Sequence, residues 1–103
     1  MKVFQYEIDI RDIFELAGLE HDIPEVLHTV EIPIKEIGKY YPATKYEPAE
    51  YPELECQVDV ADLAAELLFV VPVKLGLDQE ALFLRAAEEI CEKFIAEKTR
   101  GYI

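Results

Sequence analysis

Residues 78–98 read DQEALFLRAAEEICEKFIAEK and show the most regular helical pattern of the chain. Bulky and small apolar residues recur there at intervals of four, three and four, as Phe83, Ala87, Ile90 and Phe94. That spacing places them on one face of an α-helix, while charged residues occupy the opposite face. The stretch therefore predicts a long C-terminal helix with one side buried against the core.

Two earlier stretches alternate between apolar and polar residues, which is typical of strands with one buried face. Residues 2–10 direct one set to the core, namely Phe4, Tyr6, Ile8 and Ile10. Residues 29–37 do the same with Val30, Ile32 and Ile34. The alternation returns at 54–59. The apolar run at 68–75 indicates a further buried strand, although a helix also fits it.

Aspartates mark the expected starts of several helices, because their side chains cap free backbone N–H groups. Asp12 is placed to open a short helix that ends at Gly18, and Asp78 to open the C-terminal one. Asp22 with Glu25 three residues later predicts one or two turns reaching His28. A helix is also expected over 59–68.

These elements predict an α+β fold: a small, mostly antiparallel sheet of about four strands, packed against the long C-terminal helix and shorter helices. The length of 103 residues suits one compact domain spanning residues 1–103. Residues 40–53 hold three prolines and four tyrosines, so we expect a connecting segment there.

Composition restricts the possible functions. Apolar residues form 51% of the chain and no apolar run approaches a membrane span, so we expect a cytoplasmic protein without membrane contact. The formal net charge of −12 makes direct nucleic-acid binding unfavourable, because phosphate contacts need clustered Lys and Arg. A partner protein with a basic surface, or a second copy of the chain, fits better.

Part of the proline-rich segment is the best candidate for a protein-binding surface. Tyrosines supply contact area, prolines fix an extended backbone, and glutamates can steer a basic partner. The candidate residues are Tyr46, Glu47, Glu50, Tyr51 and Glu53. The alternative is a stiff linker whose tyrosines pack on the domain's own core.

Catalytic chemistry has few candidates. His21, Glu25 and His28 could form a small metal-dependent centre if that segment were continuously helical, but Pro24 and a cap at Asp22 would break the helix. Asp9/Asp12 and Asp59/Asp62 are spaced like helix caps.

Nucleophiles are equally scarce. The chain has no serine, Cys91 falls on the buried helix face, and Cys56 lies beside Glu55. No cofactor motif is present, and a non-enzymatic role is favoured over an enzyme.

Two short stretches resemble known families. The pattern Tyr46-Glu47-Pro48-x-x-Tyr51-Pro52-x-Leu54 resembles the segment that opens the main sheet in half of a TATA-binding protein. Residues 58–72, VDVADLAAELLFVVP, resemble a stretch of the bacterial family for large-ribosomal-RNA accumulation. The first would imply a DNA-facing sheet, yet this chain is acidic there. The second family carries a cysteine pair that this chain lacks.

The favoured function is therefore an interaction module or accessory subunit that binds another protein or itself. An acidic inhibitor, which imitates DNA and occupies the nucleic-acid site of another protein, is a further alternative.

The composition also predicts resistance to heat. The chain contains no asparagine or serine, and it is rich in Glu and Lys, as heat-adapted proteins are. We expect a calorimetric midpoint clearly above the ~45–65 °C of ordinary domains. A midpoint within that range would leave biased base composition as the explanation.

Overall fold

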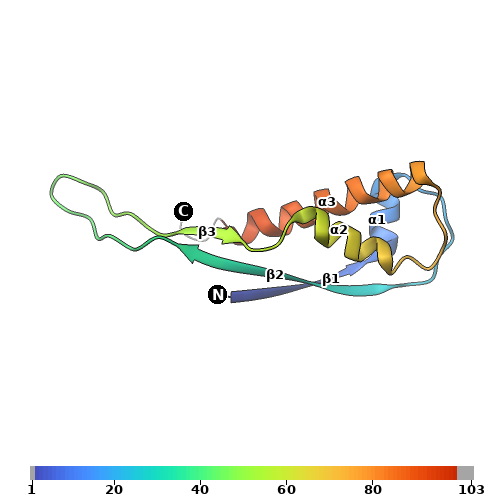
Figure 1. The fold of residues 1–103 in the computed structure, drawn as a ribbon, viewed down its shortest axis with the longest axis horizontal. Coiled ribbons are helices and arrows are strands. Elements are labelled where there is room, and N and C mark those ends of the chain that lie inside the picture. Colours follow the sequence, from blue (N-terminus) through green and yellow to red (C-terminus); the bar gives the residue numbers. More distant parts are fainter. Residues whose placement is uncertain (1, 100–103) are drawn as a thin grey trace.

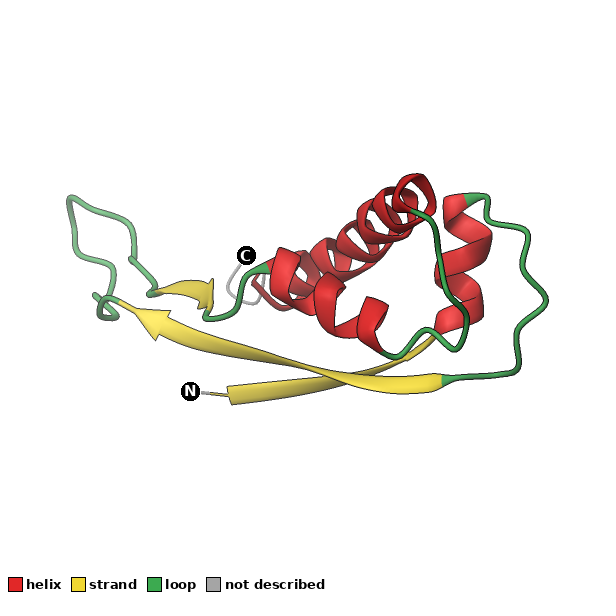
Figure 2. Cartoon of the chain, turned by 45° about the vertical axis from the view of Figure 1, so that its right-hand side comes forward, coloured by secondary structure: helices red, strands yellow, loops and turns green. Residues whose placement is uncertain are grey.

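The computed structural model describes residues 2–99 and has an α+β architecture, as the sequence predicts. Three strands form one antiparallel sheet in the order β1-β2-β3. The strands are β1 (Lys2–Asp9), β2 (Leu27–Ile37) and β3 (Glu53–Cys56), and the helices are α1 (Ile10–Ala17), α2 (Val60–Phe69) and α3 (Leu77–Thr99). All three helices lie on one side of the strands (Figure 2).

Strand β1 forms because its side chains alternate as predicted. Ile8 is buried and Phe4 and Tyr6 are half-buried, whereas Val3, Gln5 and Glu7 are exposed on the other face. The ring of Tyr6 stacks on Phe94 of α3 with centroids 4.1 Å apart, so the C-terminal half of α3 lies over the start of the strand. Lys98 lies over two rings of the strand, with Nζ 4.7 Å from the centre of the Phe4 ring and 5.9 Å from that of Tyr6.

Strand β2 is the centre of the sheet and is longer than either neighbour. It pairs with β1 over its first eight residues and with β3 over its last four. The ladder to β3 ends at Pro33, whose carbonyl accepts a hydrogen bond from the backbone N–H of Gln57 at 2.9 Å. Proline has no N–H to return that bond, which explains why β3 stops there.

Helix α1 begins three residues earlier than predicted. Its N-cap is Asp9 and not Asp12: a carboxylate oxygen of Asp9 accepts a hydrogen bond from the backbone N–H of Arg11 at 2.9 Å. The helix ends as expected at Gly18, whose φ of 72° lies in the left-handed region that glycine adopts without strain.

The predicted helix over residues 22–28 is wrong. Residues 21–26 form an irregular connection, and β2 has already begun at Leu27. Ile23 is buried, and the carbonyl of Val26 accepts a hydrogen bond from Ile10 N–H at 2.9 Å. These two tertiary contacts hold the segment extended, which outweighs the local helix-start signal of Asp22 and Pro24.

The predicted strand over residues 68–75 is also wrong, so the described part of the sheet has three strands. Residues 68–69 finish α2, and residues 70–76 are turn and coil. Val71 and Val73 are half-buried against the core without strand pairing. The apolar run thus covers the core as an irregular segment. Its sequence has no decisive period, so the pattern did not specify one secondary structure.

Helix α3 has its first residue at Leu77, so Asp78 lies inside its first turn and is not the cap. Gly76 occupies the cap position instead. Its N–H donates to Oε1 of Gln79 at 3.2 Å, and its carbonyl accepts from Glu80 N–H at 2.9 Å. Gln79 therefore supplies the reciprocal half of a capping box.

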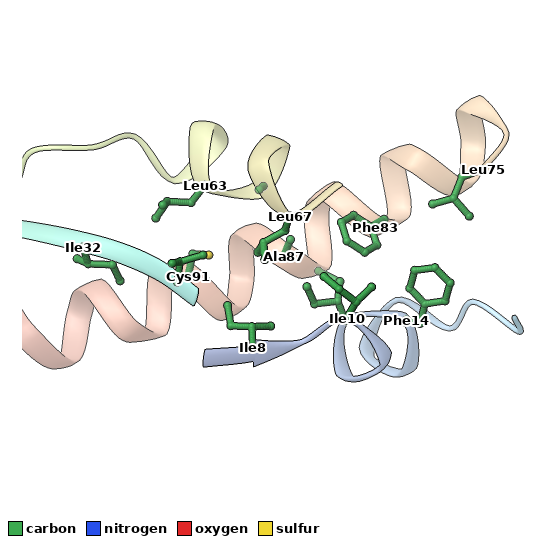
Figure 3. Packing of buried hydrophobic residues seen from close by; sticks show 14 of the residues in the cluster. Ile8, Ile10, Phe14, Ile32, Leu63, Leu67, Leu75, Phe83, Ala87 and Cys91 are labelled. Carbon is green, nitrogen blue, oxygen red and sulfur yellow. The ribbon is translucent and has the colours of Figure 1, made fainter. Parts of the chain in front are cut away.

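The core lies between α3, the sheet and the two short helices. Phe83 of α3 is fully buried and meets Phe14 of α1 edge to face, with centroids 5.7 Å apart. Leu67 of α2 is fully buried in the same cluster as Phe83 (Figure 3). The predicted apolar face of α3 is therefore confirmed, although Ile90 and Phe94 are only half-buried.

The molecule is elongated, with extents of 61 × 20 × 17 Å. The radius of gyration is 17.6 Å, against about 13 Å for a compact chain of this length. Residues 38–52, which we call the arm, account for the difference because they project beyond the helices (Figure 1).

Truncating Phe83 should test this packing. We expect Phe83→Ala to lower the free energy of unfolding by about 3–5 kcal/mol, because it removes a fully buried ring that joins two helices. Leu82→Ala, at a neighbouring side chain that is 45% exposed, is the control and should cost far less. Equal losses in denaturant titrations of the two variants would contradict the proposed core.

Candidate interaction surface

The arm continues the β2–β3 hairpin past the last ladder pair, Ile37 and Glu53. Beyond that pair only one isolated bridge remains, in which Tyr41 and Glu50 exchange two backbone hydrogen bonds of 2.9 and 2.8 Å. A regular ladder cannot extend through the arm because its prolines lack N–H donors. The arm is thus a loop whose two sides are joined part-way along by a single β-bridge.

The tip of the arm is a turn built around Thr44. Its backbone N–H donates to the carbonyl of Glu47 at 2.9 Å. Its hydroxyl oxygen accepts hydrogen bonds from the backbone N–H groups of Tyr46 and Glu47 at 3.3 and 3.1 Å. These local bonds give the tip a defined shape without support from the core.

The tyrosines of the arm are exposed. Tyr46 at the tip is 86% exposed and has Lys45 Nζ 5.7 Å from its ring centre. Tyr51 is 54% exposed and its ring lies 5.3 Å from that of Tyr40, so these two rings support each other. The alternative in which Tyr46 and Tyr51 pack against the sheet is therefore wrong.

A hollow of about 380 Å³ opens on the arm. The residues that line it are Tyr41, Pro42, Thr44, Glu47, Pro48 and Glu50. An aromatic ring, two prolines and two carboxylates form a suitable environment for a basic side chain, since carboxylates and π-faces both attract cations.

The five predicted residues occupy four different places, three on the arm and one at the start of β3. Glu47 and Glu50 line the hollow, while Tyr46 stands at the tip. Tyr51 lies beside Tyr40 at the base of the arm, near the sheet, and Glu53 is the first residue of β3. Tyr40 and Tyr41 belong to the same Pro/Tyr-rich stretch and lie on the arm as well, but the residues predicted from the sequence begin only at Tyr46.

The charge of the arm is balanced. From residue 38 to residue 52 it carries two lysines and two glutamates, which gives a net charge of zero. The overall charge of −12 therefore resides mainly on the body of the molecule. The arm offers localised carboxylates in a hollow and no broad acidic field.

The structure does not bring His21, Glu25 and His28 together. His21 packs edge to face on Phe14 with centroids 5.7 Å apart, and Glu25 reaches Arg11 at 3.4 Å. Nε2 of His28 lies 3.2 Å from a carboxylate oxygen of Glu66, close enough for an ion pair but without hydrogen-bond alignment. Residues 2–99 contain no group of three metal-ligating side chains, so the metal-centre alternative has no geometric support.

The aspartate pairs belong to helix starts. Asp9 accepts hydrogen bonds from the side chain and backbone of Arg11, which lower the pKa of its carboxyl. Asp59 occupies the cap position of α2, but its side chain makes no capping hydrogen bond there. Its carbonyl instead accepts from the N–H groups of Asp62 and Leu63.

Comparison with known proteins gives no family: the chain matches no protein-family model, no curated protein sequence and no solved structure. The two partial resemblances in the sequence therefore gain no support from relatives. Among residues 2–99, no helix has both the length and the apolar character to cross a bilayer.

The cysteines allow a direct test of the structure. Burial raises the pKa of the Cys91 thiol to about 11, so this side chain stays protonated at neutral pH. Cys56 is half-buried, and its Sγ donates to the carbonyl of Val58 at 3.2 Å. We expect iodoacetamide to leave Cys91 unmodified in the native protein and to alkylate it after unfolding, as mass spectrometry can show. Rapid native alkylation of Cys91 would contradict its placement.

Proposed function

We propose that this protein is a non-enzymatic interaction module that contacts a partner protein through its arm. The observation that carries the proposal is the position of Tyr46, which is 86% exposed at the tip of a segment held in shape by its own hydrogen bonds. Contact of an aromatic ring with water does not stabilise the isolated protein. Tyrosine is, however, common among the interface residues that contribute most to the free energy of binding. A preformed arm also limits the entropy lost on binding.

The hollow beside the tip supports a partner with a basic side chain. Glu47 and Glu50 line it together with Tyr41. A Lys or Arg from the partner would find two carboxylates and an aromatic face at one place. Such charges act mainly on the association rate and on its dependence on salt.

Site-specific photo-cross-linking should test the role of the arm. With benzoylphenylalanine in place of Tyr46, we expect a discrete adduct with a partner protein in cells that produce the chain naturally. Leu16 is the matched control position, because it is 48% exposed on α1 at the end remote from the arm (Figure 1). The same adducts from both positions, or none from Tyr46, would contradict the proposal.

Competition then tests the hollow. Unlabelled wild-type chain should suppress the adduct, and the variant Glu47→Gln/Glu50→Gln should suppress it less. Both glutamates are exposed, so the double variant should keep its free energy of unfolding within about 0.5 kcal/mol per site. Equal suppression by the two competitors would show that the carboxylates play no part.

A further inference from the structure

The two edges of the sheet differ in how they are protected from further pairing. Edge strand β3 has only four residues and follows Pro52. Edge strand β1 has eight residues, contains no proline, and pairs regularly with β2 from end to end. Short strands and prolines are the usual devices against edge-to-edge association, so β1 is the open edge.

The pairing of β1 with β2 shows which backbone groups remain free. Ile10 N–H donates to Val26, which continues the register in which Asp9 faces Leu27. In an antiparallel pair successive residues point their N–H and C=O groups to opposite sides. The even-numbered residues of β1 therefore bond β2, and Val3, Gln5 and Glu7 present their backbone groups outward. No described segment pairs with that outer side.

We propose that the open edge of β1 pairs with β1 of a second copy of this chain. The two strands would run antiparallel with Gln5 opposite Gln5 on the two-fold axis. This register sets each outward group of Val3 against Glu7 of the copy, so the free donors and acceptors of these residues are matched. The result is one continuous six-stranded sheet.

The side chains of β1 fit a copy of the same strand. Its basic residue, Lys2, stands at one end and its acidic residues, Glu7 and Asp9, at the other. An antiparallel copy keeps Glu7 and Asp9 of one strand away from the same carboxylates of the other, whereas a parallel copy would set these like charges side by side. On the inner face the half-buried rings of Phe4 and Tyr6 would lie opposite each other across the axis, which is a favourable cross-strand pair.

This interface is independent of the arm. Because the paired strands are antiparallel, the two arms would project from opposite ends of the dimer, and both would stay free for partners. A strand edge of this length buries less area than the ~1,600 Å² of standard stable interfaces, so we expect a concentration-dependent equilibrium between monomer and dimer. The net charge of −12 on each copy opposes association, and added salt should tighten the dimer by screening.

Hydrogen exchange of the full chain gives the most direct test. As protein concentration rises and sedimentation shows dimer, the amides of Val3, Gln5 and Glu7 should become protected. Those of Phe4, Tyr6 and Ile8 should be protected at every concentration, because they already bond β2. A chain that stays monomeric, or a dimer in which the outward amides exchange freely, would overturn the proposal.

Charge variants at Val3 test the register, because Val3 is 51% exposed and would face Glu7 of the copy. Cross-strand charge pairs predict that Val3→Glu raises the dimer Kd by about 2- to 30-fold, while Val3→Lys lowers it. Leu16→Glu and Leu16→Lys change the net charge equally at a distant, 48% exposed site and serve as controls. Equal changes in Kd at the two positions would overturn this pairing. Because none of these variants alters the arm, that result would not affect the proposed function of the arm.

Discussion

The rest of the structure depends on the burial of one face of α3 against the sheet and the two short helices. Phe83 stands at the centre of this contact, with the ring of Phe14 edge to face against it. Farther along the same helix, the stack of Phe94 on Tyr6 extends the contact to the start of β1. A small domain buries a limited fraction of its surface, so one long helix with a continuous apolar side supplies much of the available stabilisation.

The second constraint is the length of β2. Its first part pairs with β1 below the helices, and its last residues pair with β3 beyond the end of the β1 ladder. Pro33 lies where these two pairings meet, and it limits β3 because it cannot donate to Gln57. The extension carries the arm away from the core, and that separation leaves its tyrosines exposed to solvent.

The arm and the open edge of β1 give the molecule two separate surfaces with different chemistry. The arm offers exposed rings and a hollow with two carboxylates, suited to side-chain recognition. The strand edge offers backbone donors and acceptors, suited to the addition of another strand. A module that joins copies through one surface and recruits a partner through the other would need both to remain accessible together, and their placement at different parts of the sheet permits this.

The sequence by itself determined the elements whose pattern is strong and local: α3, β1 and β2, the short helix that ends at Gly18, and the exclusion of a regular ladder from the proline-rich arm. Their periodicity fixes which side chains share a face, whatever the rest of the chain does. Only the tertiary structure decided the segments whose local signals conflict. Burial of Ile23 overrode a helix-start signal, and packing of an apolar run against the core replaced an expected strand. The direction of the arm could likewise not be predicted from the sequence. The exposure of Tyr46 depends on how far β2 extends past the core, and no local sequence pattern encodes that distance.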